Sequence, residues 1–260
     1  MIKIKNKTVN ILWIRHGLSC SNILTSILKQ KHNCSNVSKI KKKIYKKMDN
    51  YPRDSKLTNI GKKHCKTIGK KLPKIDKIIT SQLLRAMYTG FELSKSIKNL
   101  NDKSIHISPF IQELKIKSDG KSGRTLKEID NYVNDISKIK NIYLIGKENE
   151  YNKYCNLNQF IKILTKFVLK INKKNITILV VTHGGFLDKY ITNKKIANLE
   201  VWKQKINFID NKISNIEEAE LYKKGIGSRN KEYYCDVKNY GLNNLIFNKT
   251  KKECNFDNLN

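Results

Sequence analysis

The most informative stretch of the chain is Ile176-Thr177-Ile178-Leu179-Val180-Val181, which runs directly into Thr182-His183-Gly184-Gly185. A short run that is almost wholly apolar is typical of a strand buried between two helical layers, as parallel strands are. The abrupt change to polar residues and glycines predicts that this strand delivers His183 to a loop at its carboxyl end. The stretch therefore predicts an α/β fold in which other strands of the same kind occur.

Two further strands of this kind are predicted, and each also ends in polar residues. Residues 9–14 read Val9-Asn10-Ile11-Leu12-Trp13-Ile14 and stop at Arg15-His16-Gly17. Residues 75–80 lead directly to Ser81, and the helix predicted after it carries Arg85 near its start. Shorter strands are expected at residues 105–108 and near residues 213–222, where the last strand would complete the sheet.

Helical periodicity separates these strands. Apolar residues recur at helical spacing in four segments: residues 18–30, the segment that Thr58 caps and Pro73 ends, the segment after Ser81, and residues 157–171. This alternation predicts a three-layer α/β/α sandwich with a mostly parallel central sheet. We expect a catalytic domain at residues 1–225, with a lysine-rich surface insertion at about 31–53, and a C-terminal extension at residues 226–260.

The charge of the chain is unusual. Its 260 residues include 53 Lys and Arg against 22 Asp and Glu, which gives a formal net charge of +31. A basic excess of this kind fits nucleic acid, an anionic membrane surface or a phosphorylated substrate as partner. Only five of the basic residues are arginine, and the lysines run along the whole chain, so a solvated lysine surface is favoured over a dedicated nucleic-acid face. The few arginines then mark positions where lysine would not serve.

The cysteines and the apolar runs bear on the compartment. No apolar run approaches the roughly 20 residues of a membrane helix, and residues 1–7 lack the apolar core of a secretory signal. No C-x-x-C pair occurs, which disfavours a zinc or redox motif, and free thiols in a reducing compartment are favoured over disulfides. We therefore expect a cytoplasmic protein with no membrane partner. The six cysteines are Cys20, Cys34, Cys65, Cys155, Cys235 and Cys254.

The polar strand ends define a candidate site. In an open α/β sheet, ligands bind beyond the carboxyl ends of the strands, so Arg15 and His16 are expected to meet Arg85 and His183 there. Guanidinium groups neutralise the oxygens of a phosphoryl group, and glycines such as Gly17 and Gly184 allow close approach of the backbone. A single histidine at a strand end is more often an ordinary loop residue. Two such histidines, with two of only five arginines beside them, predict a phosphoryl-binding pocket.

A series of motifs carries a resemblance to a known family, the histidine phosphatase superfamily, and in particular to its phosphoglycerate mutase-like branch. Residues 12–17 resemble the Arg-His-Gly signature, and Ser19 and Asn22 match the R-H-G-x-S-x-x-N form of that motif. The other elements that resemble the family, in the family's order, are Leu57-Thr58-Asn59-Ile60-Gly61, residues 80–89 with Ser81 and Arg85, and Val181-Thr182-His183-Gly184-Gly185.

The resemblance implies a mechanism and a role for each matching residue. His16 would attack phosphorus to form a phosphohistidine that water then hydrolyses, and the charges of Arg15 and Arg85 favour the neutral imidazole that this attack needs. His183 and the two arginines would stabilise the transferring phosphoryl group. The same comparison implies a general acid after the third strand, where Glu113 lies, with Asp119 and Glu128 as alternatives. No metal or cofactor is expected. The residues that would bind the substrate are Arg15, Ser19, Asn22, Arg85, His183 and Gly184.

Departures from the family pattern favour a phosphatase over a mutase. Leu18 stands where many mutases have Glu, and Leu114 follows Glu113 where they have Arg. No paired arginines follow to hold a second phosphate; Lys115, Lys117 and Lys121 are weak substitutes, and residues 118–124 are expected to shape the substrate entrance. We therefore predict a metal-independent phosphomonoester hydrolase that acts on a small phosphorylated substrate. The alternatives are a cofactor-dependent phosphoglycerate mutase and a catalytically weak phosphate- or nucleic-acid-binding protein.

Overall fold

The computed structural model describes residues 6–31, 54–101, 104–114, 142–144, 155–226 and 244–254. One eight-stranded sheet forms the centre of this part of the chain, in the order β4-β3-β2-β5-β1-β6-β7, with β8 paired to β6. The strands are β1 (Asn6–Arg15), β2 (Lys77–Ser81), β3 (Ile105–Ser108), β4 (Ile142–Leu144), β5 (Asn175–Thr182), β6 (Val201–Ile209), β7 (Lys212–Ile216) and β8 (Glu220–Lys223).

The sheet is mixed. Strands β1 to β5 run parallel to their neighbours, whereas β6 pairs antiparallel with β1 and also with β7 and β8. The prediction of a single last strand near residues 213–222 is therefore wrong, because three strands, β6, β7 and β8, occupy residues 201–223. Lysine and glutamine interrupt the apolar residues of β6, which hid it in the sequence. The turn after β6 places Asp210 and Asn211 at φ values of 47° and 67°, and two successive positive φ values are those of a tight hairpin.

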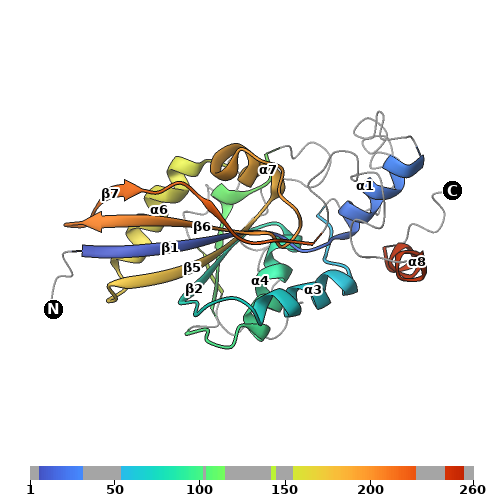
Figure 1. Cartoon of the computed structure of the whole chain (residues 1–260), viewed down its shortest axis with the longest axis horizontal. Helices are drawn as coiled ribbons and strands as arrows, with labels where there is room; N and C mark the ends of the chain where they lie inside the picture. Colours follow the sequence, from blue (N-terminus) through green and yellow to red (C-terminus); the bar gives the residue numbers. More distant parts are fainter. Residues whose placement is uncertain are drawn as a thin grey trace.

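Helices cover both faces of the sheet, which confirms the three-layer α/β/α architecture (Figure 1). On one face, α3 and α4 pack over Leu12, Ile14 and Leu179; on the other, α6 and α7 pack over Trp13 and Val180. The helical elements are α1 (Cys20–Lys31), α3 (Asn59–Gly69), α4 (Leu84–Ser96), the short turn η1 (Pro109–Ile111), α6 (Leu157–Leu169), α7 (Gly184–Leu187), the π-helical turn η3 (Asp188–Thr192) and α8 (Asn244–Glu253).

Two helix starts follow directly from the sequence. Oγ1 of Thr58 accepts a hydrogen bond from the backbone N–H of Gly61, so the cap expected for α3 is present. Asn156 caps α6 in the same way through the N–H of Gln159. The C-terminus of α3 differs from the expectation, because the helix ends at Gly69, before Pro73.

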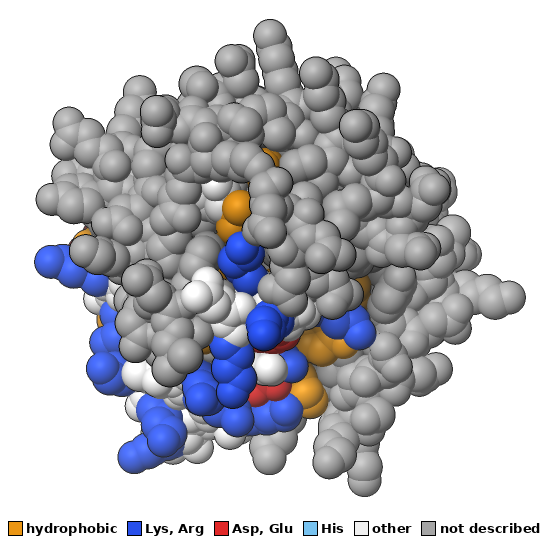
Figure 2. Space-filling model, turned by 90° about the vertical axis from the view of Figure 1, so that its right-hand side faces the viewer, with side chains coloured by type: hydrophobic (Ala, Val, Ile, Leu, Met, Phe, Trp, Pro, Cys, Tyr) orange, Lys and Arg blue, Asp and Glu red, His pale blue; other side chains and the backbone are white. Residues whose placement is uncertain are grey.

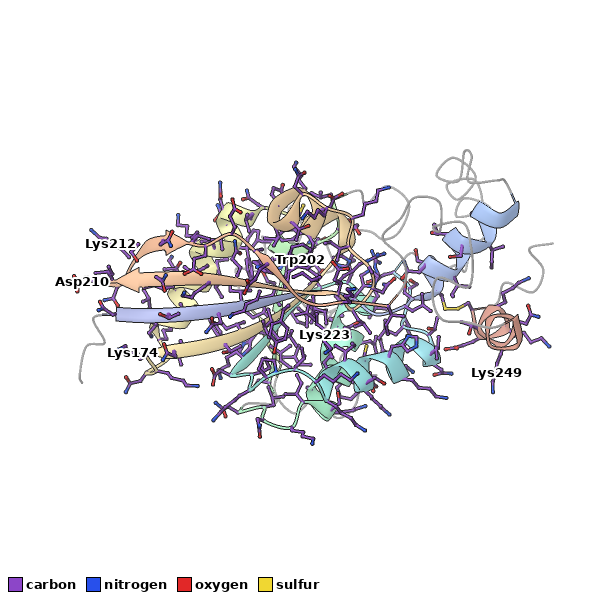
Figure 3. All side chains as sticks on the ribbon, in the orientation of Figure 1. Lys174, Trp202, Asp210, Lys212, Lys223 and Lys249 are labelled. Carbon is purple, nitrogen blue, oxygen red and sulfur yellow. A yellow bond between two sulfur atoms is a disulfide. The ribbon has the colours of Figure 1, made fainter. Side chains whose placement is uncertain are left out.

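A disulfide joins Cys20, the first residue of α1, to Cys254, just after α8 (Figure 3). The prediction of free thiols is therefore wrong for these two cysteines. Cys65 and Cys155 are free. The pair is separated by 234 residues in the chain, and a pairing over such a distance has no local signal in sequence. The disulfide also removes the cysteine argument for a reducing compartment.

Described residues of the C-terminal extension also contact the rest of the chain. Oε1 of Glu253 accepts a hydrogen bond from the backbone N–H of Asn59 at the start of α3, and Ile226 pairs with Asn198. The domain boundary at residue 225 stays a prediction. Beyond Lys31, the lysine-rich insertion at 31–53 lies outside the described residues.

The face toward which α1 and α8 lie is the one beyond the carboxyl ends of the parallel strands. Figure 2 shows Lys and Arg side chains predominating over Asp and Glu among the described residues of this face. Within the described ranges, the model contains no helix with the length and apolar character to cross a membrane.

Candidate active site

His16 follows the last residue of β1, between the parallel partner β5 and the antiparallel partner β6. Its side chain is 2% exposed. Nδ1 lies 2.8 Å from the backbone oxygen of Gly17, and Nε2 lies 3.2 Å from Nε of Arg85. The guanidinium N–H can only donate. Nε2 of His16 is therefore an acceptor, the proton sits on Nδ1, and the imidazole carries its lone pair on Nε2.

Arg85 reaches His16 from the first turn of α4. It is 2% exposed, and its Nη1 lies 3.7 Å from Oδ1 of Asp54 in a buried ion pair. Both carboxylate oxygens of Asp54 also accept from the backbone N–H of Leu84 at 2.9–3.0 Å. Thr89, one turn later on α4, accepts from the N–H of Gly17 and donates to the carbonyl of Arg85. Asp54 and Thr89 thus fix Arg85 and the strand end of His16 relative to each other.

His183 follows β5 and is fully buried. Its ring centroid lies 5.2 Å from that of His16, and its Nε2 lies 2.8 Å from Oγ of Ser81 at the end of β2. Burial, together with the positive charges of Arg85 and Arg15, holds the pKa of His183 well below its ordinary value. His183 is therefore neutral at physiological pH.

Arg15 is held by the segment 196–200, which joins η3 to β6. Nη1 of Arg15 donates to the carbonyl of Ile196 at 2.6 Å, and the carbonyl of Arg15 accepts from the N–H of Leu199. Leu199 has a φ of 58°, in the left-handed region that branched side chains rarely adopt. A strained residue of this kind persists where its surroundings fix it, and here it contacts the strand end that carries Arg15 and His16.

Ser19 and Asn22 lie at the start of α1, beside His16. Oδ1 of Asn22 accepts three hydrogen bonds, from the backbone N–H and the hydroxyl of Ser19 and from Nδ2 of Asn198. Because these donors fix the amide orientation, the Nδ2 donor of Asn22 points away from them. Asn198 also donates to the carbonyl of His16 at 2.8 Å. The first motif of the sequence therefore folds around the half-buried amide of Asn22.

Glu113 follows η1 by two residues in the chain, and its side chain contacts the first turn of α7. Its Oε1 accepts from the backbone N–H of Leu114 and of Gly185, at 3.0 and 3.1 Å. A side chain at Gly185 would collide with this carboxylate, and one at Gly184 would press on the guanidinium of Arg15. The two glycines after His183 therefore let an acid and an arginine approach the same turn. The alternative acids Asp119 and Glu128 lie outside the described residues, as do Lys115, Lys117 and Lys121.

Three nitrogens of this cluster share one property. Arg15 Nε, Arg85 Nη1 and His183 Nδ1 are buried and have no hydrogen-bond partner in the part of the chain that the structure describes. Buried N–H groups are normally paired. Arg85 Nη1 faces Asp54 only at ion-pair distance, 3.7 Å. Two guanidinium nitrogens and one imidazole nitrogen in this state suit an anion with several acceptor oxygens. Nowhere in the described ranges do three or more His, Cys, Asp or Glu side chains gather as a metal site requires.

The sequence motifs located Arg15, His16, Arg85 and His183, and the structure brings these four together. They did not locate Asp54, which pairs with Arg85, or Asn198, which bonds the carbonyl of His16. Asp54 lies three residues before the Leu57-Thr58 motif, and its polar neighbours show no periodicity. Asn198 lies in an irregular segment. A buried polar residue in an irregular segment has no pattern that distinguishes it from an exposed one.

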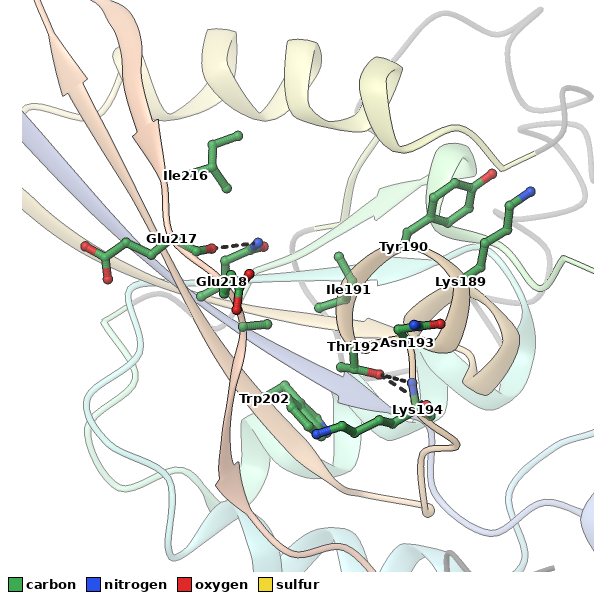
Figure 4. A pocket seen from close by; sticks show the side chains of 12 residues that line it. Lys189, Tyr190, Ile191, Thr192, Asn193, Lys194, Trp202, Ile216, Glu217 and Glu218 are labelled. Carbon is green, nitrogen blue, oxygen red and sulfur yellow. Dashed lines mark hydrogen bonds between the residues drawn. The ribbon is translucent and has the colours of Figure 1, made fainter.

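A separate cavity of about 600 Å³ lies between η3 and strands β6 and β7 (Figure 4). None of the residues expected in the site lines it. Its wall carries the indole of Trp202 with the ammonium group of Lys194 5.8 Å from the ring. Lys189 and two glutamates, Glu217 and Glu218, also line it. Because charges of both signs face this cavity, electrostatics favours no class of ligand there.

Comparisons with known proteins identify the family of the chain. Residues 46–211 match the family model described as histidine phosphatase superfamily (branch 1). The match begins after His16, so the first motif rests on its own residues and on the geometry above. A search of curated proteins gave no match.

Solved structures with a similar fold include three phosphatases. The ecdysone phosphate phosphatase from Bombix mori is 12% identical, with 76% of this chain and 88% of that chain covered and a TM-score of 0.47. Phosphoserine phosphatase from Entamoeba histolytica is 15% identical, with 81% of this chain and 97% of that chain covered and a TM-score of 0.40. The mycobacterial glucosyl-3-phosphoglycerate phosphatase is 11% identical, with 84% of this chain and 99% of that chain covered and a TM-score of 0.44. Likenesses at these values carry no information on the substrate of this chain.

Proposed function

Because the chain belongs to branch 1 of the histidine phosphatase superfamily, we propose that it hydrolyses phosphomonoesters through a phosphohistidine on His16, without a metal ion. The observation that carries the proposal is the set of three buried nitrogens without a hydrogen-bond partner, Arg15 Nε, Arg85 Nη1 and His183 Nδ1. A phosphoryl group has enough acceptor oxygens for all three, and the two guanidinium charges match its negative charge.

The first chemical step is in-line attack by Nε2 of His16 on phosphorus. The hydrogen-bond pattern supports this role, since Nδ1 faces the Gly17 carbonyl and the lone pair is on Nε2. That lone pair accepts from Nε of Arg85, and it becomes free for attack when a phosphoryl oxygen takes over the Arg85 N–H. A bond forms between Nε2 and phosphorus, the ester P–O bond breaks, and its electron pair goes to the leaving oxygen. Charge on the equatorial oxygens is stabilised by the guanidinium groups of Arg15 and Arg85 and by the N–H of neutral His183.

Glu113 would supply the proton that the leaving oxygen needs. The backbone N–H groups of Leu114 and Gly185 both bind Oε1, so Oε2 is the oxygen free to carry a proton. In the second step, water attacks the phosphohistidine while Oε2 accepts its proton, the N–P bond breaks, and inorganic phosphate leaves with His16 regenerated. The same carboxyl acts first as acid and then as base.

Hydrolysis of an aryl phosphate in the presence of a chelator tests the proposal. Wild-type protein is expected to turn over, and His16→Ala to lose at least about a thousandfold of that activity, because the nucleophile is removed. His64→Ala is the matched control, because this half-buried histidine on α3 takes part in none of the hydrogen bonds described for the cluster. Undiminished hydrolysis by His16→Ala, or wild-type turnover that the chelator abolishes, would overturn the proposal.

A further inference from the structure

Ser81 and Ser108 are closely matched residues with one difference between them. They end the neighbouring parallel strands β2 and β3 and pair in register. Both side chains are fully buried. Each hydroxyl oxygen accepts, at 3.4 Å, from the backbone N–H two residues later, that of Leu83 and that of Phe110. Only Ser81 also reaches a histidine, with its Oγ 2.8 Å from Nε2 of His183.

The tautomer of His183 decides what the site can do with an anion. A neutral imidazole carries a single N–H, on Nδ1 or on Nε2, and the burial of His183 among positive charges keeps the ring neutral. If the proton were on Nε2, it would point at Ser81, and Nδ1 would offer only a lone pair to an incoming anion. With the proton on Nδ1, the buried unpartnered nitrogen becomes a donor.

The environment of Ser81 favours one of these two arrangements. A hydroxyl has one proton and two lone pairs. The N–H of Leu83 already donates to Oγ, and the hydroxyl proton remains to be placed. Directed at Nε2 of His183, that proton makes Ser81 the donor and the ring nitrogen the acceptor. Oγ of Ser81 and Nε2 of His183 are then both satisfied, and the imidazole N–H is left on Nδ1.

We propose that Ser81 is a positioning residue that fixes the tautomer of His183, with the Ser81 hydroxyl donating to Nε2 so that Nδ1–H is available to an oxyanion. The proposal deepens the phosphatase assignment, since it names the group that prepares His183 for the phosphoryl oxygens. Ser81 itself touches neither the phosphoryl group nor His16 in this role. Its effect passes entirely through the ring of His183.

The direct test is the ¹⁵N NMR spectrum of the full-length protein, with His183 assigned by comparison with a His183→Gln variant. Protonated and lone-pair ring nitrogens differ widely in ¹⁵N shift, so the tautomer is read without any turnover. The wild-type protein is expected to show Nδ1 protonated and Nε2 as an acceptor. Ser81→Ala is expected to lose this signature, and Ser108→Ala to keep it. A wild-type spectrum with the proton on Nε2 would overturn the proposal.

Binding of inorganic phosphate gives a second readout. Ser81→Ala is expected to raise the dissociation constant for phosphate about ten- to a hundredfold, the usual effect of losing one hydrogen bond to a charged group. The dissociation constant of Ser108→Ala is expected to stay within about twofold of wild type. Equal losses in the two variants would mean that both serines act only on the strand ends, and would contradict the proposal. An inactive wild-type protein that still shows the Nδ1–H signature would remove the phosphatase assignment and leave the role of Ser81 standing.

Discussion

The side-chain amide of Asn198 donates a hydrogen bond of 2.8 Å to the backbone carbonyl of His16 and another of 3.3 Å to Oδ1 of Asn22. One buried residue thereby contacts both the proposed nucleophile and the side-chain amide of Asn22, a proposed substrate-binding residue. Because both protons of its NH₂ group are used, a side chain of the same shape that cannot donate would disturb both residues together.

Asn198→Asp is such a change. It replaces two donors with a buried carboxylate that repels the same two oxygens, so kcat/KM for an aryl phosphate is expected to fall by about ten- to a hundredfold. Steady-state kinetics on folded protein measures the effect. Asn207→Asp, toward the far end of β6, is the control and should retain wild-type kinetics. Wild-type kcat/KM in Asn198→Asp would show that the amide does not position the site.

Glu113→Gln should separate esters by their leaving group. If Oε2 protonates the leaving oxygen, loss of the proton slows esters of poorly acidic alcohols much more than activated aryl esters, whose leaving groups need little protonation. Rates for a series of esters with increasing leaving-group pKa provide the measurement. Equal losses along the whole series would assign the acid to another residue.

The disulfide between Cys20 and Cys254 should contribute strongly to stability, because it closes a loop of 234 residues across the chain. Cys254→Ser is expected to lower the free energy of unfolding by about 2–4 kcal/mol, measured by denaturant titration. A reductant should lower the free energy of unfolding of the wild type to that of Cys254→Ser, and should not change that of Cys254→Ser. Cys155→Ser, at a free half-buried thiol, is the control. A wild-type free energy of unfolding that the reductant does not change would contradict a stabilising role of the disulfide.

His183 should make stability depend on pH in the acidic range. Its pKa is lowered in the folded protein by burial and neighbouring positive charge, whereas in the unfolded chain it returns to about 6.5. Below that pH the unfolded state binds a proton that the folded state does not, so the free energy of unfolding falls as pH falls, by up to about 1.4 kcal/mol per pH unit. Denaturation of wild type and His183→Gln at about pH 7.5 and about pH 5.5 isolates this residue. The same acid sensitivity in both proteins would exclude it as the cause.

The sequence was sufficient for the architecture and for the four central side chains, and the reason is physical. Apolar strands that end in Arg15-His16, in Ser81 and in His183 must place those residues at one edge of a parallel sheet. The antiparallel strands β6 to β8 were harder to predict from the sequence, because polar and charged residues interrupt their apolar pattern. Asp54, Asn198 and the partner of Cys20 depend on contacts between distant segments, which local periodicity does not encode.

The central claim is that His16 becomes covalently phosphorylated during turnover. Rapid mixing of the wild-type protein with an aryl phosphate, an alkaline quench and peptide mass spectrometry would locate the phosphoryl group, because phosphohistidine survives alkali. The account predicts phosphate on His16 within the first turnover and none in His16→Ala. Continued turnover with the phosphoryl group on another residue would contradict it.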